Sequence, residues 1–307
     1  MEKILKKIAN TIVLNLDNSC QIGLFDGKMG LCCYLFAYSK KYASITHHKI
    51  ACDILRDIVL TTFSDVDMMS KDTMCEIGIG LVMLIDKGHV DDIDNGGFLE
   101  RIDNYVFNKV MSVEEMCQKS ERCDMFLAGI YAYHRLKVTR SENEKMQIVS
   151  FLKATFTLLD SKDAFKISEK TFSFWSSVLY VLMALKEKIS EENEDSSLVH
   201  LCEKLEKGLK AAIGDGDIPI EEKIFANGLF LTPIELDKKN NVTFDLNKNS
   251  WKYLICERDV EVMKLEKNNL AKYVNDMITN TFYSLLSVNS NLAAIGLLMI
   301  NNKLTNI

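Results

Sequence analysis

The stretch GLFDGKMGLCCYLFAYSKKY, residues 23–42, places Gly27 and Gly30 at the head of an apolar run that is typical of a buried helix. Glycine inside a helix costs about 1 kcal/mol relative to alanine, because glycine loses more backbone freedom on folding. Glycine there also lets another backbone approach closely. The stretch therefore raises the question of whether the same pattern recurs along the chain.

The pattern of a small residue followed by an aliphatic residue and an apolar segment occurs six times. The six small residues are Gly30, Gly80, Gly129, Ser177, Gly228 and Gly296. The steps between them are 50, 49, 48, 51 and 68 residues. This spacing indicates an internal repeat of one supersecondary unit.

Segments of a second kind lie between these apolar segments. They carry apolar residues at helical spacing on one stripe only, and they cover the N-terminal residues 1–16 and then 47–63, 97–111, 143–160, 196–213 and 268–286. A helix with one apolar stripe exposes its other face, whereas a helix that is apolar nearly all round is buried. Each repeat is thus predicted to be one amphipathic helix and one buried helix.

Six such hairpins predict an all-α protein, and we expect them to close into an α/α toroid, or double α-barrel, as a single domain over residues 1–307. The buried helices would form the inner wall, where small residues relieve crowding. An open α-solenoid is the alternative, but its end repeats would need polar caps, and both end units remain apolar. The alternation of Val242, Phe244 and Leu246 predicts a short hairpin in the long last step.

Composition limits the partners of the chain. Its net charge is −6, and its lysines form no basic run interleaved with aromatic residues, so nucleic acid is not an expected partner. No apolar run reaches the ~18 residues that a membrane span needs, and the N-terminus reads as an amphipathic helix rather than a signal peptide. The nine cysteines include no Cys-x-x-Cys pair, which favours reduced, buried thiols in a cytoplasmic protein.

The segments GLFDGKMGLCCYLFAYSKKY (23–42) and CEIGIGLVMLIDKGHVDD (75–92) resemble the lanthionine synthetase C-like proteins, in particular the short bacterial type. The mark of that family is a Gly-x-x-Gly-[Leu/Ile] motif at the start of each inner helix of a double α-barrel. The resemblance implies a role in the biosynthesis of ribosomally made, lanthipeptide-type modified peptides. It also implies a precursor peptide or a peptide-modifying enzyme as the partner.

The well-known members of that family are zinc enzymes that close thioether rings. Their zinc ligands are two cysteines and a histidine, and one cysteine directly precedes the histidine. This sequence contains no Cys-His dipeptide. We therefore predict no zinc site and no other cofactor, and we favour peptide or partner binding over zinc-dependent cyclisation.

Three acids are the candidate catalytic residues, namely Asp26, Glu76 and Asp124, of which Asp124 corresponds to an inner-helix Asp of the family. Each could instead serve a structural role, as an N-cap for the aspartates or as an early-turn glutamate that stabilises the helix dipole. The candidate peptide-binding residues are Gly27, Gly30, Gly78, Gly80 and His134, with packing as the alternative role.

Two other functions remain open at this point. Six-hairpin α/α barrels often carry paired carboxylates, so a carbohydrate-active hydrolase or lyase that uses two of the three acids is one alternative. A non-catalytic helical scaffold is the other, and it would fill the central space with side chains. The tryptophans, Trp175 and Trp251, are few for a protein that stacks sugars.

Overall fold

The computed structural model describes most of the first half of the chain and short pieces of the rest. The described residues are 2–19, 21–24, 27–64, 69–91, 97–107, 124–139, 141–161, 199–201, 203–204, 235–236, 242–243, 272, 275, 278, 292–293, 296 and 300. The chain divides into two compact units. Unit 1 comprises Met1–Ile93, Asn227–Pro233 and Asn247–Ile307, and unit 2 comprises Asp94–Ala226 and Ile234–Leu246.

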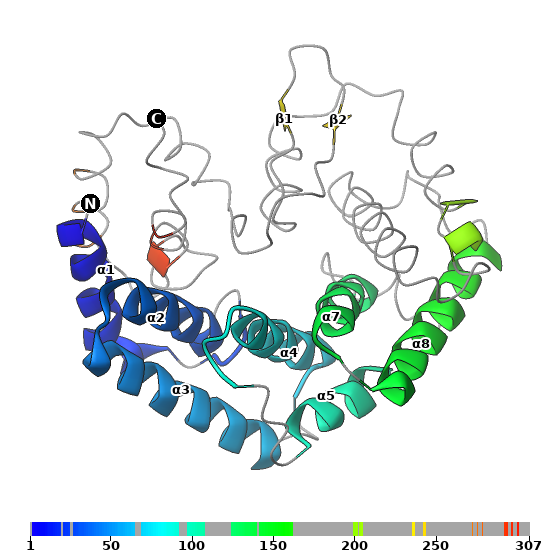
Figure 1. The fold of residues 1–307 in the computed structure, drawn as a ribbon, viewed down its shortest axis with the longest axis horizontal. Coiled ribbons are helices and arrows are strands. Elements are labelled where there is room, and N and C mark those ends of the chain that lie inside the picture. Colours follow the sequence, from blue (N-terminus) through cyan, green and yellow to red (C-terminus); the bar gives the residue numbers. More distant parts are fainter. Residues whose placement is uncertain are drawn as a thin grey trace. The chain divides into compact units, whose positions relative to one another are not determined.

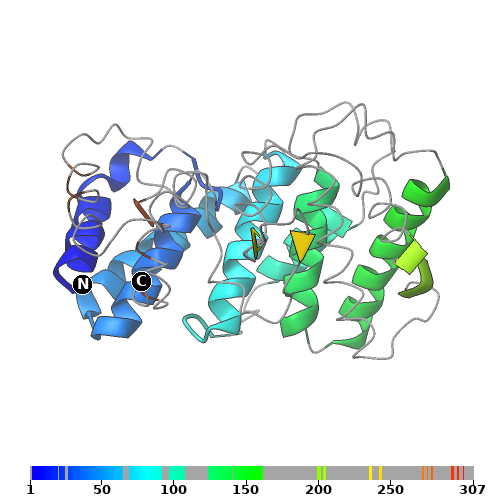
Figure 2. The same cartoon turned by 90° about the horizontal axis from the view of Figure 1, so that it is seen from above.

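Four α-helices and a 3-10 turn form the described N-terminal part of unit 1. They are α1 (Glu2–Leu14), η1 (Leu16–Asn18), α2 (Lys28–Tyr42), α3 (Ile45–Ser64) and α4 (Lys71–Asp86). Helix α2 contacts α1, α3 and α4, and its neighbour α3 runs beside it in both views (Figures 1 and 2). Helix α2 is thus the centre of this unit.

Helix α2 is buried on nearly every face, as its sequence predicts. Its hydrogen bonds tie it to both neighbouring amphipathic helices: the Tyr34 hydroxyl donates to the Leu5 carbonyl of α1 at 2.9 Å, and the Cys32 thiol contacts the Ala51 carbonyl of α3 at 3.3 Å. Helices α1 and α3 bury one stripe each, namely Leu5, Ile8, Ala9 and Ile12 in α1 and Ala51, Ile54, Ile58 and Thr62 in α3. The three-and-four spacing of these stripes confirms the amphipathic prediction.

Helix α4 corrects the predicted position of its glycines. The helix begins at Lys71, where the Ser70 hydroxyl caps it by accepting the Thr73 amide at 3.1 Å. Gly78 and Gly80 therefore lie in the middle of the helix rather than at its start, and Glu76 lies beyond the first turn. Every residue of α4 from 74 to 84 is buried, so α4 is a second all-round buried helix.

Residues near the C-terminus pack onto the first hairpin of unit 1. Gly296 lies so close to the Tyr34 ring that a Cβ there would overlap the ring. The Lys41 ammonium donates to the Ile300 carbonyl at 2.8 Å, and the Lys7 ammonium donates to the Asn275 side-chain oxygen at 2.6 Å.

Unit 2 contains α5 (Phe98–Phe107), α7 (Asp124–Val138) and α8 (Glu142–Ser161). Helix α8 contacts both α5 and α7, and Phe107 of α5 stacks on Tyr131 of α7 at 5.4 Å between ring centroids. The amphipathic segments predicted at 97–111 and 143–160 correspond to α5 and α8. A hairpin of β1 (Glu235–Leu236) and β2 (Val242–Thr243) is antiparallel, which confirms the predicted strand at Val242.

A buried ion network joins α5, α7 and α8, the helices of unit 2 among the described residues. The Arg135 guanidinium of α7 donates to Asp103 of α5 at 3.0 Å and pairs with Glu144 of α8 at 3.0 Å. The Tyr131 hydroxyl donates to Asp103 at 2.6 Å. Burial raises the pKa of the Asp103 carboxyl, and Arg135 and Tyr131 offset part of that rise. Because each buried charge has partners, removing one partner would strand another.

The all-α prediction is confirmed for the described residues, apart from the β1–β2 hairpin. Closure into a toroid and the single domain over residues 1–307 stay predictions. The small residues Ser177 and Gly228 lie outside the described residues, as do most of 196–213 and 268–286. No described helix is long and apolar enough to cross a membrane.

Candidate functional site

The start of α2 is a close backbone packing site. The loop before the helix folds back, with the Lys28 amide donating to the Gln21 carbonyl at 2.9 Å. Gly27 is the N-cap residue, and a Cβ there would lie 2.5 Å from the Gly23 amide nitrogen and 2.7 Å from the Gly23 carbonyl oxygen. Its φ of −136° is open to any residue, so the requirement for glycine is steric.

The same loop and the start of α2 pack against the middle of α4. A Cβ on Gly80 would lie 2.5 Å from Cγ of Met29, and a Cβ on Gly23 would overlap the Glu76 carboxylate. We call these five residues, Gly23, Gly27, Met29, Glu76 and Gly80, the glycine junction. The sequence flagged three of the five residues, Gly27, Glu76 and Gly80, as a possible site or a family mark, and the structure brings them together as tight packing.

The other predicted site residues lie outside the glycine junction. Asp26 lies outside the described residues, and Gly30 and Gly78 are buried within α2 and α4. Asp124 is the first residue of α7, as predicted. His134 is 2% exposed on α7, and its ring meets Tyr133 edge-on at 5.3 Å between centroids.

The carboxylate pair needed by a carbohydrate-active enzyme stays a prediction. Of the three candidate acids, only Glu76 has a described side chain, and it is 8% exposed beside Gly23. This acid packs in the glycine junction.

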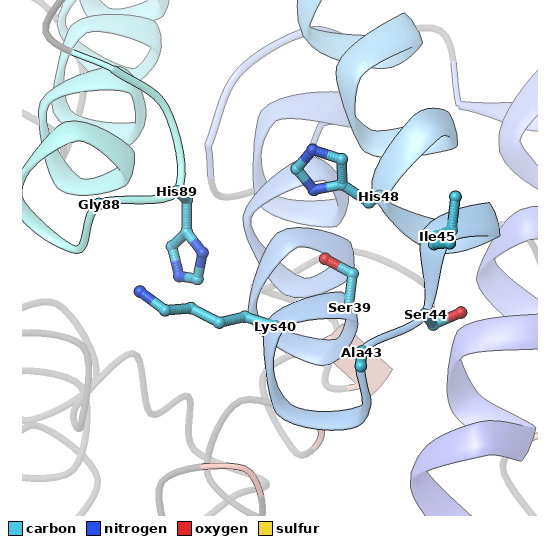
Figure 3. Close-up of a pocket in the computed structure, with 8 residues that line it drawn as sticks. All are labelled: Ser39, Lys40, Ala43, Ser44, Ile45, His48, Gly88 and His89. Atoms are coloured by element: carbon cyan, nitrogen blue, oxygen red, sulfur yellow. The ribbon is translucent and has the colours of Figure 1, made fainter.

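A cavity of about 430 Å³ opens at the opposite end of α2 (Figure 3). Its polar and titratable lining comes from the end of α2, the start of α3 and the turn after α4, namely Ser39, Lys40, Ser44, His48 and His89. Ala43, Ile45 and Gly88 complete the wall. None of the eight lining residues is acidic. We call this site the α2-end pocket.

Two helix caps shape the α2-end pocket. At the end of α4 the Gly88 amide donates to Ile85 at 2.9 Å and the His89 amide donates to Leu84 at 2.9 Å, which is the Schellman pattern. Gly88 has φ of +61°, the left-handed conformation that this cap requires. The cap turns the chain back, so that His89 comes to lie against α2.

The end of α2 uses a similar cap with a different residue. Ala43 has φ of +50°, and the amides of Ala43 and Ser44 both donate to the Ser39 carbonyl. A residue with a Cβ is strained in this conformation by about 1 kcal/mol or more. The sharp turn lets α3 begin at Ile45, directly beside the end of α2.

Aromatic and basic groups meet in the α2-end pocket. The Phe36 ring lies 5.4 Å from the His48 ring, edge-on, and 6.1 Å from the His89 ring, between centroids. Lys40 extends toward His89 in Figure 3, and its ammonium donates to the Lys87 carbonyl at 2.8 Å. The Lys40 bond joins the ends of α2 and α4.

The electrostatics of the α2-end pocket favour a neutral imidazole. Burial is the largest cause that lowers the pKa of His89 to about 4, and the charges of Lys40, His48 and Lys87 act in the same direction. The nearby Asp86 carboxylate pairs with Lys87 at 3.3 Å. At neutral pH the pocket therefore presents a cationic lysine beside an uncharged His89, which can donate or accept a hydrogen bond.

The described thiols partly match their prediction. Cys32, Cys33 and Cys75 are buried thiols rather than disulfides, whereas Cys52 is exposed on α3, which corrects the prediction for that residue. Burial raises the pKa of the Cys32 and Cys33 thiols, so both are protonated at neutral pH. Within the described ranges, no group of three or more His, Cys, Asp or Glu side chains is arranged to hold a metal ion.

The sequence reasoning missed the α2-end pocket. The signal that could have found the pocket is Gly88, because glycine after a helix ends it in a fixed turn and so fixes where His89 points. The sequence prediction concentrated on the repeated glycines, which lie near the start of α2.

The resemblance of residues 23–42 and 75–92 to lanthionine synthetase C-like proteins stays a prediction. No family model, no curated protein and no solved structure matches the chain.

Proposed function

We propose that this chain is a lanthionine synthetase C-like helical protein that binds a precursor peptide or a peptide-modifying enzyme in the biosynthesis of ribosomally made modified peptides. The observation that carries the proposal is the contact between the two ends of the repeat. Residues of the last hairpin, Asn275, Gly296 and Ile300, meet Lys7, Tyr34 and Lys41 of the first.

Contact between the first and last hairpins supports a closed ring. In an open solenoid each repeat touches only its neighbours, so the end repeats lie far apart. The Gly296–Tyr34 contact requires that the sixth small residue of the pattern packs on the helix of the first. A closed double α-barrel is the architecture that the resemblance implies.

The alternation of helix types supports the same architecture. Within unit 1, α2 and α4 are buried nearly all round, whereas α1 and α3 each bury one stripe. In unit 2, most of the described side chains of α7 are buried, whereas α5 is amphipathic. An inner and an outer layer of helices requires this alternation along the chain.

The described donor residues do not fit the zinc centre of a thioether cyclase. A cysteine binds zinc as its thiolate, and burial opposes ionisation of Cys32 and Cys33. The Cys32 thiol also contacts the Ala51 carbonyl at 3.3 Å, a contact that suits the protonated form. These features, together with the missing Cys-His dipeptide, favour binding over cyclisation.

The genes beside the gene for this chain are first searched for a precursor peptide, and binding is then tested with the peptide found there. The full-length protein is titrated into a fluorescein-labelled precursor peptide, and anisotropy is followed. We expect saturable binding that a scrambled peptide of equal composition does not show. A neighbouring dehydratase takes the place of the peptide in a second titration. Failure of both partners to bind would contradict the proposal.

Cyclisation is tested separately, because adding a thiol to a dehydrated residue leaves the peptide mass unchanged. The dehydrated peptide is incubated with the protein and zinc, its remaining thiols are alkylated, and the product is weighed by mass spectrometry. We expect every thiol to remain free for alkylation. Loss of thiols, with stoichiometric zinc in the purified protein, would make the chain an enzyme instead.

Ring closure has its own test. A lysine is placed at position 275 by Asn275→Lys, and a short amine cross-linker is added to the dilute protein. We expect a link between Lys7 and position 275 within one chain, since these two side chains are in contact. The wild-type protein is the control, and a link that forms only between chains would argue for an open arrangement.

A further inference from the structure

We propose that the α2-end pocket binds a small organic anion, in which a carboxylate or phosphate group is attached to an apolar body. This site lies at the opposite end of α2 from the glycine junction. The proposal stands independently of peptide binding, and either one can fail alone.

The charge of the pocket wall selects an anion. Lys40, His48 and His89 line the pocket, Lys87 lies beside it, and no lining residue is acidic. Helix α3 begins at Ile45 in the same wall, so the positive end of its dipole adds to the field. The basic side chains come from α2, from α3 and from the turn after α4, and together with the first turn of α3 they act on one cavity.

The apolar part of the pocket selects an organic molecule. Ala43 and Ile45 form an aliphatic part of the pocket wall, with Ile45 73% exposed, and the Phe36 ring, which is buried outside the lining, packs on both imidazoles. The volume of about 430 Å³ lies in the range of small-molecule sites. A bare inorganic anion would leave much of that volume to water, whereas an aromatic or aliphatic body would fill it.

Binding of the anion is coupled to a proton on His89. The basic groups that face this imidazole are Lys40 from α2, His48 from α3 and Lys87 from the end of α4, and Asp86 offsets the charge of Lys87. A bound anion neutralises part of this field and raises the pKa of His89 from about 4 toward its ordinary value of 6.5. Affinity therefore rises as the pH falls below that value.

The test uses four probes on the full-length protein: benzoate, phenyl phosphate, benzyl alcohol and inorganic phosphate. Calorimetry at about pH 5.5 and about pH 7.5 measures affinity, and NMR follows the ring protons of His48 and His89. We expect at least one of the two aromatic anions to bind, more tightly at the lower pH. The tighter of the two identifies the anionic group. Benzyl alcohol and inorganic phosphate should bind at least roughly tenfold more weakly.

Four variants locate the binding. Lys40→Met and His89→Gln should each weaken the better probe by roughly tenfold, because the first removes a charge from the wall and the second removes the imidazole that takes up a proton. Lys49→Met is the matched control: Lys49 is exposed on α3, outside the lining, and its loss changes the net charge equally. Lys40→Arg keeps the charge and should retain most of the affinity. Circular dichroism verifies that each variant folds.

Five results would overturn the proposal, and the first four concern the histidine signals, the control variant, the uncharged probe and the pH. They are unchanged His48 and His89 signals with both aromatic anions, an equal loss of affinity in Lys49→Met, binding of benzyl alcohol as tight as that of the anions, and no tightening at the lower pH. Inorganic phosphate binding as tightly as phenyl phosphate would remove the apolar body from the proposal and so contradict it as stated.

Discussion

The two ends of α2 have opposite characters. At its start, backbone meets backbone at Gly23 and Gly27, and Met29 fills the space against Gly80. At its end, two left-handed caps turn the chain away and leave a cavity of about 430 Å³. A repeated glycine before or within a buried helix can therefore mark close packing, whereas a glycine after a helix can mark the wall of a pocket.

The two ends of α2 also require glycine for two different reasons, at Gly27 and at Gly88. Gly27 has an extended backbone that any residue could adopt, and it must be small because of its neighbours. Gly88 has open space around it, because a Cβ added there would lie 4.0 Å from the Lys40 ammonium, but its φ of +61° disfavours a side chain. Substitutions at the two ends should therefore lower the free energy of unfolding for different reasons and by different amounts.

The largest effect is expected for Gly27→Ala at the packed end. The new methyl meets only backbone atoms, at 2.5 Å and 2.7 Å from Gly23, and backbone cannot rotate away as a side chain can. We expect a loss of about 3 kcal/mol in the free energy of unfolding. Urea unfolding followed by circular dichroism measures it, with Thr46→Ala on the exposed first turn of α3 as the control. A loss no greater than that of the control would contradict backbone packing at Gly27.

Gly80→Ala should cost less, because its methyl meets the flexible Met29 side chain at 2.5 Å. Overpacking opposes the better helix propensity of alanine, so we expect a net loss of about 1.5 kcal/mol. In a Met29→Ala background the methyl has room, and Gly80→Ala should become neutral or stabilising. The double-mutant cycle measures this coupling, and additive effects of the two changes would show that Met29 is not the cause.

Much of the fold followed from the sequence because hydrophobic periodicity reports burial directly. The stripes of α1, α3 and α5 and the all-round apolar character of α2 and α4 match the observed burial. The predicted start of α4 is wrong, because the repeat pattern puts a helix start at Gly80. The cap at Ser70 decides that boundary, and a capping serine is a weaker signal than a repeated glycine.

The candidate site was harder to predict, because a pocket is made by elements that are distant in sequence. Lys40, His48 and His89 have no motif spacing, and only the geometry of the two caps brings them to one cavity. Ala43 carries no signal, since alanine is rare in a left-handed turn. The ion network of Asp103 and Arg135 was missed for the same reason: α5 and α7 meet only in the folded unit.

A change of pH should act on the open end of α2 through His89. The pKa of His89 is lowered to about 4 in the folded protein, against 6.5 for an unperturbed imidazole. The unfolded chain therefore takes up a proton first, and stability is full above pH 6.5 and falls as the pH drops toward 4. Allowing for solvent screening at this half-buried ring, we expect the loss to be about 1.5 kcal/mol.

The difference in unfolding free energy between wild type and His89→Gln isolates this contribution. Other groups that titrate over the same range contribute to both proteins and cancel. Relative to His89→Gln, the wild type should lose free energy of unfolding as the pH falls from 6.5 to 4. Below that range the difference between the two proteins should stay constant. A flat difference across this range would mean that His89 keeps its ordinary pKa in the folded protein.

Gly88→Ala tests the cap that positions His89. Alanine at φ of +61° costs about 1 kcal/mol in the free energy of unfolding, measured by urea titration. The strain should also loosen the turn, so that the NMR signal of His89 shifts while that of the buried His134 does not. Gly27→Ala should leave the His89 signal in place in its remaining folded fraction. A shift of equal size in both variants would show that the two ends of α2 are not independent.

Ala43→Gly should give the smallest effect, and it has the opposite sign. Ala43 occupies the left-handed position at the end of α2, with φ of +50°, where glycine has no Cβ to strain. The strain relieved, about 1 kcal/mol or more, exceeds the extra freedom that glycine gives the unfolded chain, so we expect a gain of about 0.5 kcal/mol. Ala37→Gly, within α2, is the matched control and should lose stability. If both glycines destabilise alike, then the turn at Ala43 is not strained, and the two caps that flank the pocket differ in sequence without differing in energy.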